Sequence, residues 1–255
     1  MIHGRDPRDS QESDPSTAGG TPMVAVILTA LNEAGKIGRT LDRFPRDGRF
    51  EAIVVDDGST DGTGVEAREH GADVVLRHEQ RQGVGAGIRT GIAWARERQR
   101  PLIAFLAGDD QHEPSDLVRA LDLFLTKKLD YIQGSRWISG GRVEGPSGGR
   151  ATGTRIYSLV FSFLVGRRVT DATNGFRIFK SEILDDPAID IDQAWLNTYE
   201  LEPYLLYKVI TRGYRVAECP VTVRYHGEGY TKMRGIRDWW RLLRPAMLLR
   251  TGRKT

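Results

Sequence analysis

The sequence of 255 residues has a single cysteine, Cys219, and no long apolar run. One cysteine excludes a disulfide framework within the chain and fits a reducing compartment. The longest apolar candidate, residues 156–165, is interrupted by serines and falls short of the roughly 18 residues that a membrane-spanning helix needs. Residues 1–22 are polar and lack the apolar segment of a signal peptide. We therefore expect a disordered leader over residues 1–22, followed by one domain, in a cytoplasmic protein.

The sequence also lacks a strong overall charge, since its net charge is +3, but basic residues gather near the C-terminus. Between residues 234 and 255 arginine and lysine stand against Asp238 alone; the basic residues are Arg234, Arg237, Arg241, Arg244, Arg250, Arg253 and Lys254. Helical spacing puts four apolar side chains on one stripe, with Trp239 at its edge: Ile236, Trp240, Leu243 and Met247. A solvated helix face and a nucleic-acid patch are the alternatives, but tryptophan beside arginine favours an anionic membrane surface. We expect peripheral contact with the cytoplasmic face of a membrane, and no nucleic-acid partner.

Strand and helix patterns alternate through the first half of the chain. Short apolar runs predict strands at residues 24–29, 52–55, 74–76, 102–106 and 131–133. Helical periodicity predicts helices near residues 37–44, 64–70, 86–98 and 115–124. Because each strand is apolar throughout, the pattern is typical of a mainly parallel sheet with helices on both faces. The fold class expected is α/β, with a nucleotide-binding architecture.

The alternation loosens after residue 133. Five glycines between residues 140 and 149 indicate a mobile loop. Helices are expected near residues 154–165 and 198–211, and a late strand over residues 216–223. No repeat at solenoid spacing is present.

Polar loops follow three of the expected strands. They read T-A-L-N-E at residues 29–33, D-D-G-S-T-D at 56–61 and A-G-D-D-Q-H at 107–112. Each alone is an ordinary turn or helix cap, but ligands of parallel sheets bind beyond the carboxyl ends of the strands, where one ligand could touch all three. The glycine-rich segment at residues 83–91 is not a dinucleotide fingerprint, because it follows the third strand and has different spacing. Its glycines would let a helix pack close to the sheet or to a nucleotide.

The ordered set of motifs resembles the family 2 glycosyltransferases. The motifs are V-I-L-T-A-L-N-E, V-V-D-D-G-S-T-D-G-T, G-D-D-Q-H-E-P, G-S-R and D-A-T-N-G-F-R-I-F. Over residues 23–233 the chain is most similar to the dolichyl- or polyprenyl-phosphate mannose or glucose synthase branch. The resemblance implies a single GT-A domain and a hexosyltransferase that moves a sugar, with inversion, from a GDP- or UDP-linked donor to a polyprenyl phosphate. It also implies Mg²⁺ or Mn²⁺ as cofactor.

The resemblance also implies which residues bind the donor. The nucleotide would contact Ala30, Leu31, Asn32, Glu33, Asp56, Asp57, Asp109 and Asp110. The branch's acidic motif, D-A-D-x-Q-H, places Ala107 where relatives have the first aspartate. If the backbone stays extended, Asp109 and Gln111 lie on one side and bind the metal, while Asp110 faces away. The alternative is a bent loop that brings Asp110 into the site.

Basic residues would hold the phosphates. By the resemblance these are Arg136 in G-S-R, Arg150 with Thr154, and Lys232 in G-Y-T-K-M; with Asp109, the two arginines and the lysine form the expected catalytic set. His226 stands where relatives have an arginine, so either His226 or Arg224 could replace it.

The acceptor decides whether a base is needed. A phosphate is ionised near neutral pH and needs none, whereas a sugar or glycolipid hydroxyl would require one. Glu200 is the candidate base for a hydroxyl acceptor, although Glu200 and Glu202 could simply flank a helix. The altered acidic motif also leaves open a third function, that of an inert nucleotide-sugar-binding protein.

Overall fold

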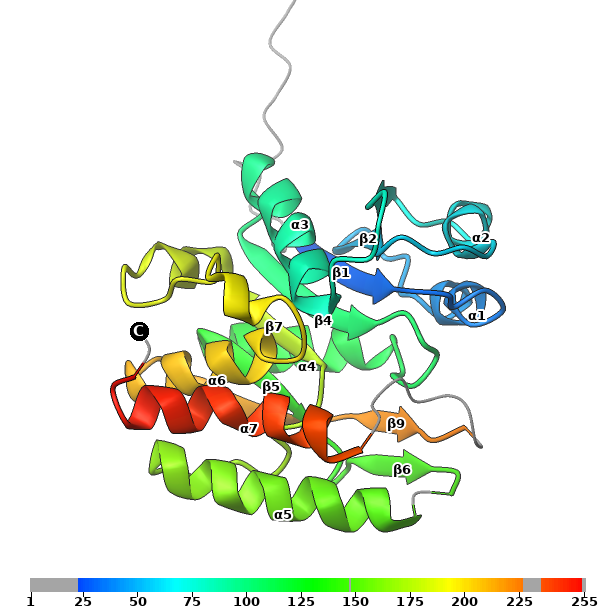
Figure 1. Cartoon of the computed structure of the whole chain (residues 1–255). Helices are drawn as coiled ribbons and strands as arrows, with labels where there is room; N and C mark the ends of the chain where they lie inside the picture. Colours follow the sequence, from blue (N-terminus) through cyan, green and yellow to red (C-terminus); the bar gives the residue numbers. More distant parts are fainter. Residues whose placement is uncertain (1–22, 147, 227–234, 254–255) are drawn as a thin grey trace, which may run out of the picture.

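The computed structural model describes residues 23–146, 148–226 and 235–253, so the predicted leader lies outside the described residues (Figure 1). A central sheet of seven strands has the order β3-β2-β1-β4-β7-β5-β8. Its strands are β1 Val24–Ala30, β2 Phe50–Asp56, β3 Val74–Arg77, β4 Leu102–Ala107, β5 Tyr131–Ser135, β7 Arg177–Lys180 and β8 Val216–Pro220. The paired strands are parallel except at β7, which runs antiparallel to both β4 and β5. The prediction of a mainly parallel α/β sheet is confirmed.

Helices cover both faces of this sheet (Figure 1). The α-helices are α1 Ile37–Asp42, α2 Thr63–Glu69, α3 Val84–Glu97, α4 Asp116–Thr126, α5 Gly148–Val165, α6 Leu201–Thr211 and α7 Gly235–Arg250. Two 3₁₀ turns, Ser181–Asp185 and Ala194–Leu196, lie between β7 and α6. Along β1, Val24, Val26 and Leu28 pack with α1, α2 and α4, whereas Ala25 and Ile27 pack with α3, α5, α6 and α7. Successive strand residues point to opposite faces, so a strand buried on both sides is apolar throughout.

The second half departs from the sequence prediction in two places. The glycine-rich segment contains a strand, β6 Arg142–Glu144, which pairs with β9 Thr222–Arg224 in a separate two-stranded sheet. The late strand predicted over residues 216–223 is therefore divided between β8 and β9. It divides after Pro220, which has no backbone N–H for a sheet hydrogen bond.

The glycines of α3 allow close packing. A Cβ at Gly85 would lie 2.0 Å from the Leu196 carbonyl oxygen, and one at Gly91 would lie 2.6 Å from the Ile27 side chain. Neither position has room for a side chain. These glycines therefore let α3 pack against the sheet and the adjacent 3₁₀ turn. The sheet is one of the two partners expected for them, the other being a nucleotide.

The C-terminal helix α7 is part of the domain core. Leu242 and Ala246 are buried, and the Tyr157 hydroxyl donates a hydrogen bond of 2.8 Å to the Leu242 carbonyl. The predicted stripe is divided, because Leu243 packs against the core while Trp240 and Met247 are 50% and 38% exposed. Residue Arg234 and the side chains of Ile236 and Arg237 lie outside the described residues. Among the described helices, none combines the length and apolarity that crossing a membrane requires.

Candidate active site

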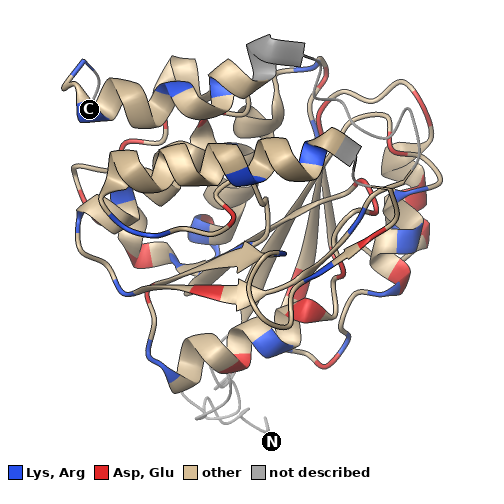
Figure 2. Ribbon diagram, turned by 90° about the horizontal axis from the view of Figure 1, so that it is seen from below, with Lys and Arg blue, Asp and Glu red and all other residues tan. Residues whose placement is uncertain are grey.

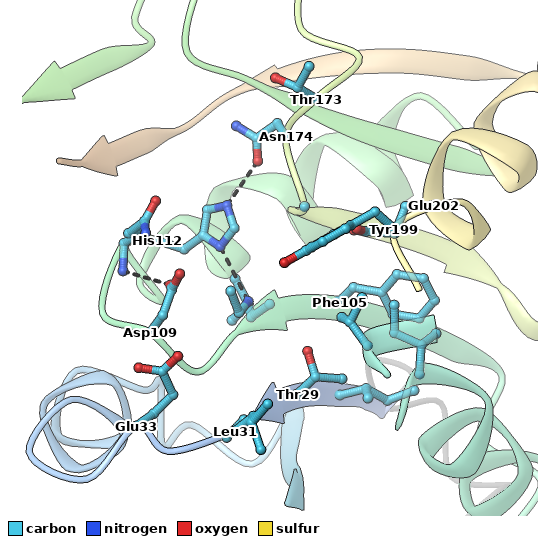
Figure 3. Close-up of a pocket in the computed structure, with 18 of the residues that line it drawn as sticks. Thr29, Leu31, Glu33, Phe105, Asp109, His112, Thr173, Asn174, Tyr199 and Glu202 are labelled. Atoms are coloured by element: carbon cyan, nitrogen blue, oxygen red, sulfur yellow. Dashed lines mark hydrogen bonds between the residues drawn. The ribbon is translucent and has the colours of Figure 1, made fainter. Parts of the chain in front are cut away.

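A cavity of about 230 Å³ opens beyond the carboxyl ends of β1 and β4 (Figure 3). The loops after β1, β2 and β4 supply one side, including Leu31, Glu33, Asp57 and Asp109. Residues from the second half close the other side; they are Arg136, Arg150, Thr173, Asn174, Gly175, Tyr199, Glu202, Val223 and Leu242. The three polar loops predicted to meet do so here, since the strands that carry them are neighbours in the sheet.

Asp109 and Gln111 both line the cavity, whereas Asp110 turns away from it. Asp110 has a positive φ of 63°, so the loop is bent at this residue rather than extended as predicted. The Asp110 carboxylate instead accepts hydrogen bonds from Arg39 Nε, at 2.8 Å, and from Arg43, both on or beside α1. The expected separation of Asp109 and Asp110 is thus present, but a left-handed turn produces it.

Burial, together with the nearby charge of Glu33, raises the pKa of Asp109 to about 6. Figure 3 shows the Glu33 carboxylate next to the Asp109 side chain. A bound cation would relieve this repulsion, and Mg²⁺ commonly binds one or two carboxylates plus substrate phosphates. Within the described residues, no group of three or more histidine, cysteine or acidic side chains could hold a metal alone. Asp109 and Gln111 therefore fit a cation whose other ligands come from a diphosphate.

His112, beside these residues, serves the loop's structure. Its Nε2 donates to Asn174 Oδ1 at 3.0 Å, and its Nδ1 accepts from the Ala107 backbone N–H at 3.4 Å. Burial, with the nearby charge of Arg136, lowers the pKa of His112 to about 4, so the ring is neutral at pH 7. The histidine thus ties the acidic loop to the D-A-T-N-G segment, a connection that the sequence analysis missed.

The side of the cavity formed by the loops after β1 and β2 is held in place by its own hydrogen bonds. The Asp57 carboxylate accepts from His78 Nδ1 and from the backbone N–H groups of Gln82 and Gly83, each at 2.8 Å. Asp56 was predicted to contact the nucleotide. It is instead fully buried, pairs with Arg77 at 2.8 Å and does not line the cavity. Asn32, also predicted to contact the nucleotide, is not among the residues that line the cavity, and its side-chain oxygen accepts a hydrogen bond from the Thr60 N–H. Ala30, Leu31 and Glu33 do line the cavity.

Arg136 lines the cavity but is committed to other residues. Its Nε and Nη2 atoms donate to the two oxygens of buried Asp171, at 2.6 and 3.0 Å, and its Nη1 donates to the Tyr225 hydroxyl at 2.5 Å. Arg150, in the first turn of α5, lies over the Tyr225 ring at 5.0 Å. Within the described chain no carboxylate pairs with Arg150. Of the two arginines predicted to bind phosphate, Arg136 is therefore engaged by Asp171 and Tyr225, whereas Arg150 is available to an anion.

The remaining predicted phosphate contacts have separate outcomes. The Thr154 hydroxyl donates to the Ala151 carbonyl at 2.9 Å within α5, so Thr154 does not face the cavity. Lys232 lies outside the described residues. Arg224 is paired with Glu113 and Glu144, and His226 Nε2 donates to the Asp110 carbonyl at 2.9 Å.

The two glutamates near α6 have different positions. Glu200, the predicted base, is buried outside the cavity, where it accepts from Thr198 and pairs with Arg244 at 3.2 Å. Glu202 lines the cavity and pairs with the buried Arg177. Glu200, named as base only for a hydroxyl acceptor, is therefore not among the residues that line the cavity, whereas Glu202, two residues further along, is.

Comparison with known proteins agrees with this geometry. The model of the family described as glycosyl transferase family 2 matches residues 25–186. The chain is 30% identical to polyprenol monophosphomannose synthase of Mycolicibacterium smegmatis, covering 87% of this chain and 85% of the relative. It is also 30% identical to undecaprenyl-phosphate mannosyltransferase of Micrococcus luteus, covering 83% and 88%.

A solved structure shows the same fold. Glucosyl-3-phosphoglycerate synthase of Mycobacterium tuberculosis was crystallised with Mn²⁺, UDP and glucosyl-3-phosphoglycerate. It superposes with a TM-score of 0.68 at 22% identity, covering 91% of this chain and 80% of that one. The matched family model spans well over half of the chain. The chain belongs to glycosyl transferase family 2 and has the GT-A fold.

Proposed function

We propose that this protein transfers a hexose, with inversion, from a GDP- or UDP-linked donor to a polyprenyl phosphate. The observation that carries the proposal is the chemistry of the acceptor side of the cavity. Arg150 offers a cation there without a carboxylate partner in the described chain, and Glu202 is neutralised by Arg177. Such a wall suits an anionic acceptor better than a hydroxyl, which would need an available base. Both relatives described above carry names that refer to polyprenyl acceptors.

The reaction needs no proton transfer from the protein. An oxygen of the acceptor phosphate forms a bond to the anomeric carbon as the bond from that carbon to the diphosphate oxygen breaks. The electron pair leaves with the nucleoside diphosphate, and attack from the opposite side inverts the configuration. A phosphate monoester is largely dianionic at neutral pH, because its second pKa is about 6.

Four groups would divide this work. Asp109 and Gln111 would hold Mg²⁺ or Mn²⁺, which neutralises charge on the departing diphosphate. Arg150 would bind the acceptor phosphate by charge-assisted hydrogen bonds. Lys232 remains proposed as a second phosphate contact. Arg136 is better described as a positioning residue, because it holds Tyr225, over whose ring Arg150 lies.

A two-stage assay tests this function. Thermal shift with Mn²⁺ would first select among GDP- and UDP-sugars, and the selected donor would then be incubated with polyprenyl phosphate. Product should form with the phosphate and not with the matching unphosphorylated polyprenol. Transfer to the alcohol or to a soluble sugar alone would contradict the proposal. Donor binding without transfer to any acceptor would favour an inert binding protein.

A further inference from the structure

The outward side of α5 is apolar where a surface helix is normally polar. Ile156, Leu159, Val160 and Phe163 are 58, 73, 38 and 84% exposed. They stand at positions i, i+3, i+4 and i+7, so they form one continuous stripe. The inward side is also apolar, with Tyr157 and Phe161 in the core. An apolar patch of this kind on a folded domain marks a surface that contacts something else.

Basic side chains border this stripe. Arg155, Arg167 and Arg168 share a shallow groove with Leu159 and Phe163. Arg155 lies over the Trp137 ring at 4.3 Å, and Arg167 donates to the Val216 carbonyl at 2.6 Å. In the described part of the chain, none of these three arginines pairs with a carboxylate.

The surrounding sequence also favours an anionic partner. From residue 145 to residue 170 there is no aspartate or glutamate. Figure 2 shows α5 with blue bands and no red, beside α7. We propose that the α5 outer face, defined as the four apolar residues with Arg155, Arg167 and Arg168, binds an anionic phospholipid bilayer. The apolar stripe inserts to the depth of the interface, and the arginines contact lipid phosphates.

Two other occupants fit less well. A symmetric contact with a second copy would bring the same patch together twice and would place uncompensated arginines near one another. The N-terminal 22 residues have Met1 and Ile2 as their only large apolar side chains, too few to cover the stripe. A bilayer supplies apolar depth and negative charge over one continuous surface.

The same helix joins this face to the cavity. Arg150, in the first turn of α5, lines the cavity, and the stripe begins at Ile156, less than two turns further along. Trp239 of α7 packs on Gly153 between them, where a Cβ would lie 3.1 Å from the indole. A bilayer on the α5 outer face would therefore lie near the cavity side that we assign to the acceptor. This link rests on the proposed function, whereas binding of the bilayer does not.

Vesicle sedimentation tests the surface without a donor. The full chain would be mixed with vesicles of phosphatidylcholine alone, or with phosphatidylcholine and phosphatidylglycerol. Leu159→Ser with Phe163→Ser should weaken binding to the anionic vesicles at least about tenfold, since both side chains lose apolar burial. Arg167→Gln with Arg168→Gln should weaken it by about fivefold for each arginine, and added salt should reduce that difference.

Matched controls separate α5 from other surfaces. Trp240→Ser with Met247→Ser changes the exposed apolar residues of α7, and Lys127→Gln with Lys128→Gln removes two charges beyond α4; both should bind nearly as the parent does. Binding that depends on the α7 pair and not on the α5 pair would overturn the proposal, as would an absence of vesicle binding. Light scattering provides a further test: a parent dimer that the Leu159 and Phe163 changes convert to monomer would assign the face to a second copy.

Two readouts keep this inference distinct from the proposed function. The serine variants should retain the parent's thermal transition and its turnover of a short-chain, water-soluble polyprenyl phosphate. Vesicle binding without any transfer would leave the surface standing and contradict the function. If transfer occurs but the α5 variants bind vesicles as the parent does, the proposed function stands and the assignment of the surface is contradicted.

Discussion

Arginines on the α1 side of the molecule and arginines on α5 are placed in opposite settings. On the α1 side, Arg39 and Arg43 hold Asp110, and across the same region Arg77 holds Asp56. On α5, Arg150 and Arg155 lie over aromatic rings instead and have no carboxylate partner within the described chain. A paired arginine fixes a loop, whereas an arginine without an internal anion remains available to an external one. On the side of the cavity that we propose for the donor, internal charge pairs therefore fix the loops. On the side proposed for the acceptor, Arg136 and Arg177 are also paired, but Arg150 lines the cavity without a carboxylate partner among the described residues.

The largest expected effect comes from the two neighbouring aspartates. Asp109→Asn should abolish the gain in nucleoside diphosphate affinity that Mn²⁺ provides, because the cavity loses its candidate metal carboxylate. Transfer should fall by at least about 100-fold. Asp110→Asn should keep most of the metal-dependent gain but lower the free energy of unfolding by about 1–3 kcal/mol, since Arg39 and Arg43 lose their charged partner. Calorimetric titration with and without Mn²⁺, plus urea unfolding, measures both.

This pair of variants gives a direct ranking. Burial alone would raise the pKa of Asp110, but hydrogen bonds from Arg39 and Arg43 hold it below its ordinary value. Asp110 is therefore charged at pH 7 as a structural partner of α1. A larger loss of metal-dependent affinity in Asp110→Asn than in Asp109→Asn would show that the assignment of the two carboxylates is reversed.

A smaller effect is expected from the unpaired cation. Arg150→Ala should lower turnover with polyprenyl phosphate by about 100-fold, corresponding to about 3 kcal/mol, while nucleoside monophosphate affinity stays within about twofold. Arg96→Ala is a matched control, because it removes a surface arginine in the last turn of α3 that pairs with Asp185. It should leave both quantities unchanged. Steady-state kinetics and nucleotide titration provide the measurements. Full transfer by the Arg150 variant would remove this residue from the acceptor site.

The same two sides differ in how well their structures could be predicted. On the donor side each strand, loop and helix is a local pattern, and the expected strand at residues 24–29 differs from β1 Val24–Ala30 by one residue. The position of the polar loops then follows from parallel pairing. The acceptor side depends on contacts between distant segments. Strand β7 has only four residues and lies between β4 and β5, which no local periodicity indicates.

Individual residues show the same limit. Asp110 turns away because of a left-handed backbone, and aspartate tolerates that conformation without requiring it. Glu200 has suitable chemistry, but its partner Arg244 lies in α7, whose orientation the sequence does not specify. Thr154 instead bonds to the Ala151 carbonyl in its own helix, a local alternative that its motif does not indicate. The exposed stripe of α5 could have been found from its spacing. Its neighbours on the inward side are equally apolar, however, so the sequence alone does not tell which side is covered.

The smallest expected effect concerns a carboxylate that pairs with an arginine far from the cavity. Asp130, just before β5, accepts hydrogen bonds from Arg215 at 2.9 and 3.1 Å and pairs with Lys180 at 3.1 Å. The Arg215 hydrogen bond is the main reason that the pKa of Asp130 lies well below its ordinary value of 3.8. A carboxyl group with a depressed pKa stabilises the fold when it is ionised, so this contribution is present above about pH 4 and is lost as the pH falls further.

Asp130→Asn should therefore lower the free energy of unfolding by about 1–2 kcal/mol at pH 7, because one charged acceptor that joins β5, β7 and β8 is removed. The difference from the parent should shrink as the pH falls below about 4, because the Asp130 carboxyl of the unfolded parent then takes up a proton while the folded one stays ionised to lower pH. Asp122→Asn is a suitable control, since Asp122 is 61% exposed beside Arg49 and should contribute little at either pH. Urea unfolding at a series of pH values gives the comparison. A difference that stays constant from pH 7 to pH 3 would mean that the Asp130 contribution arises from shape and not from its charge.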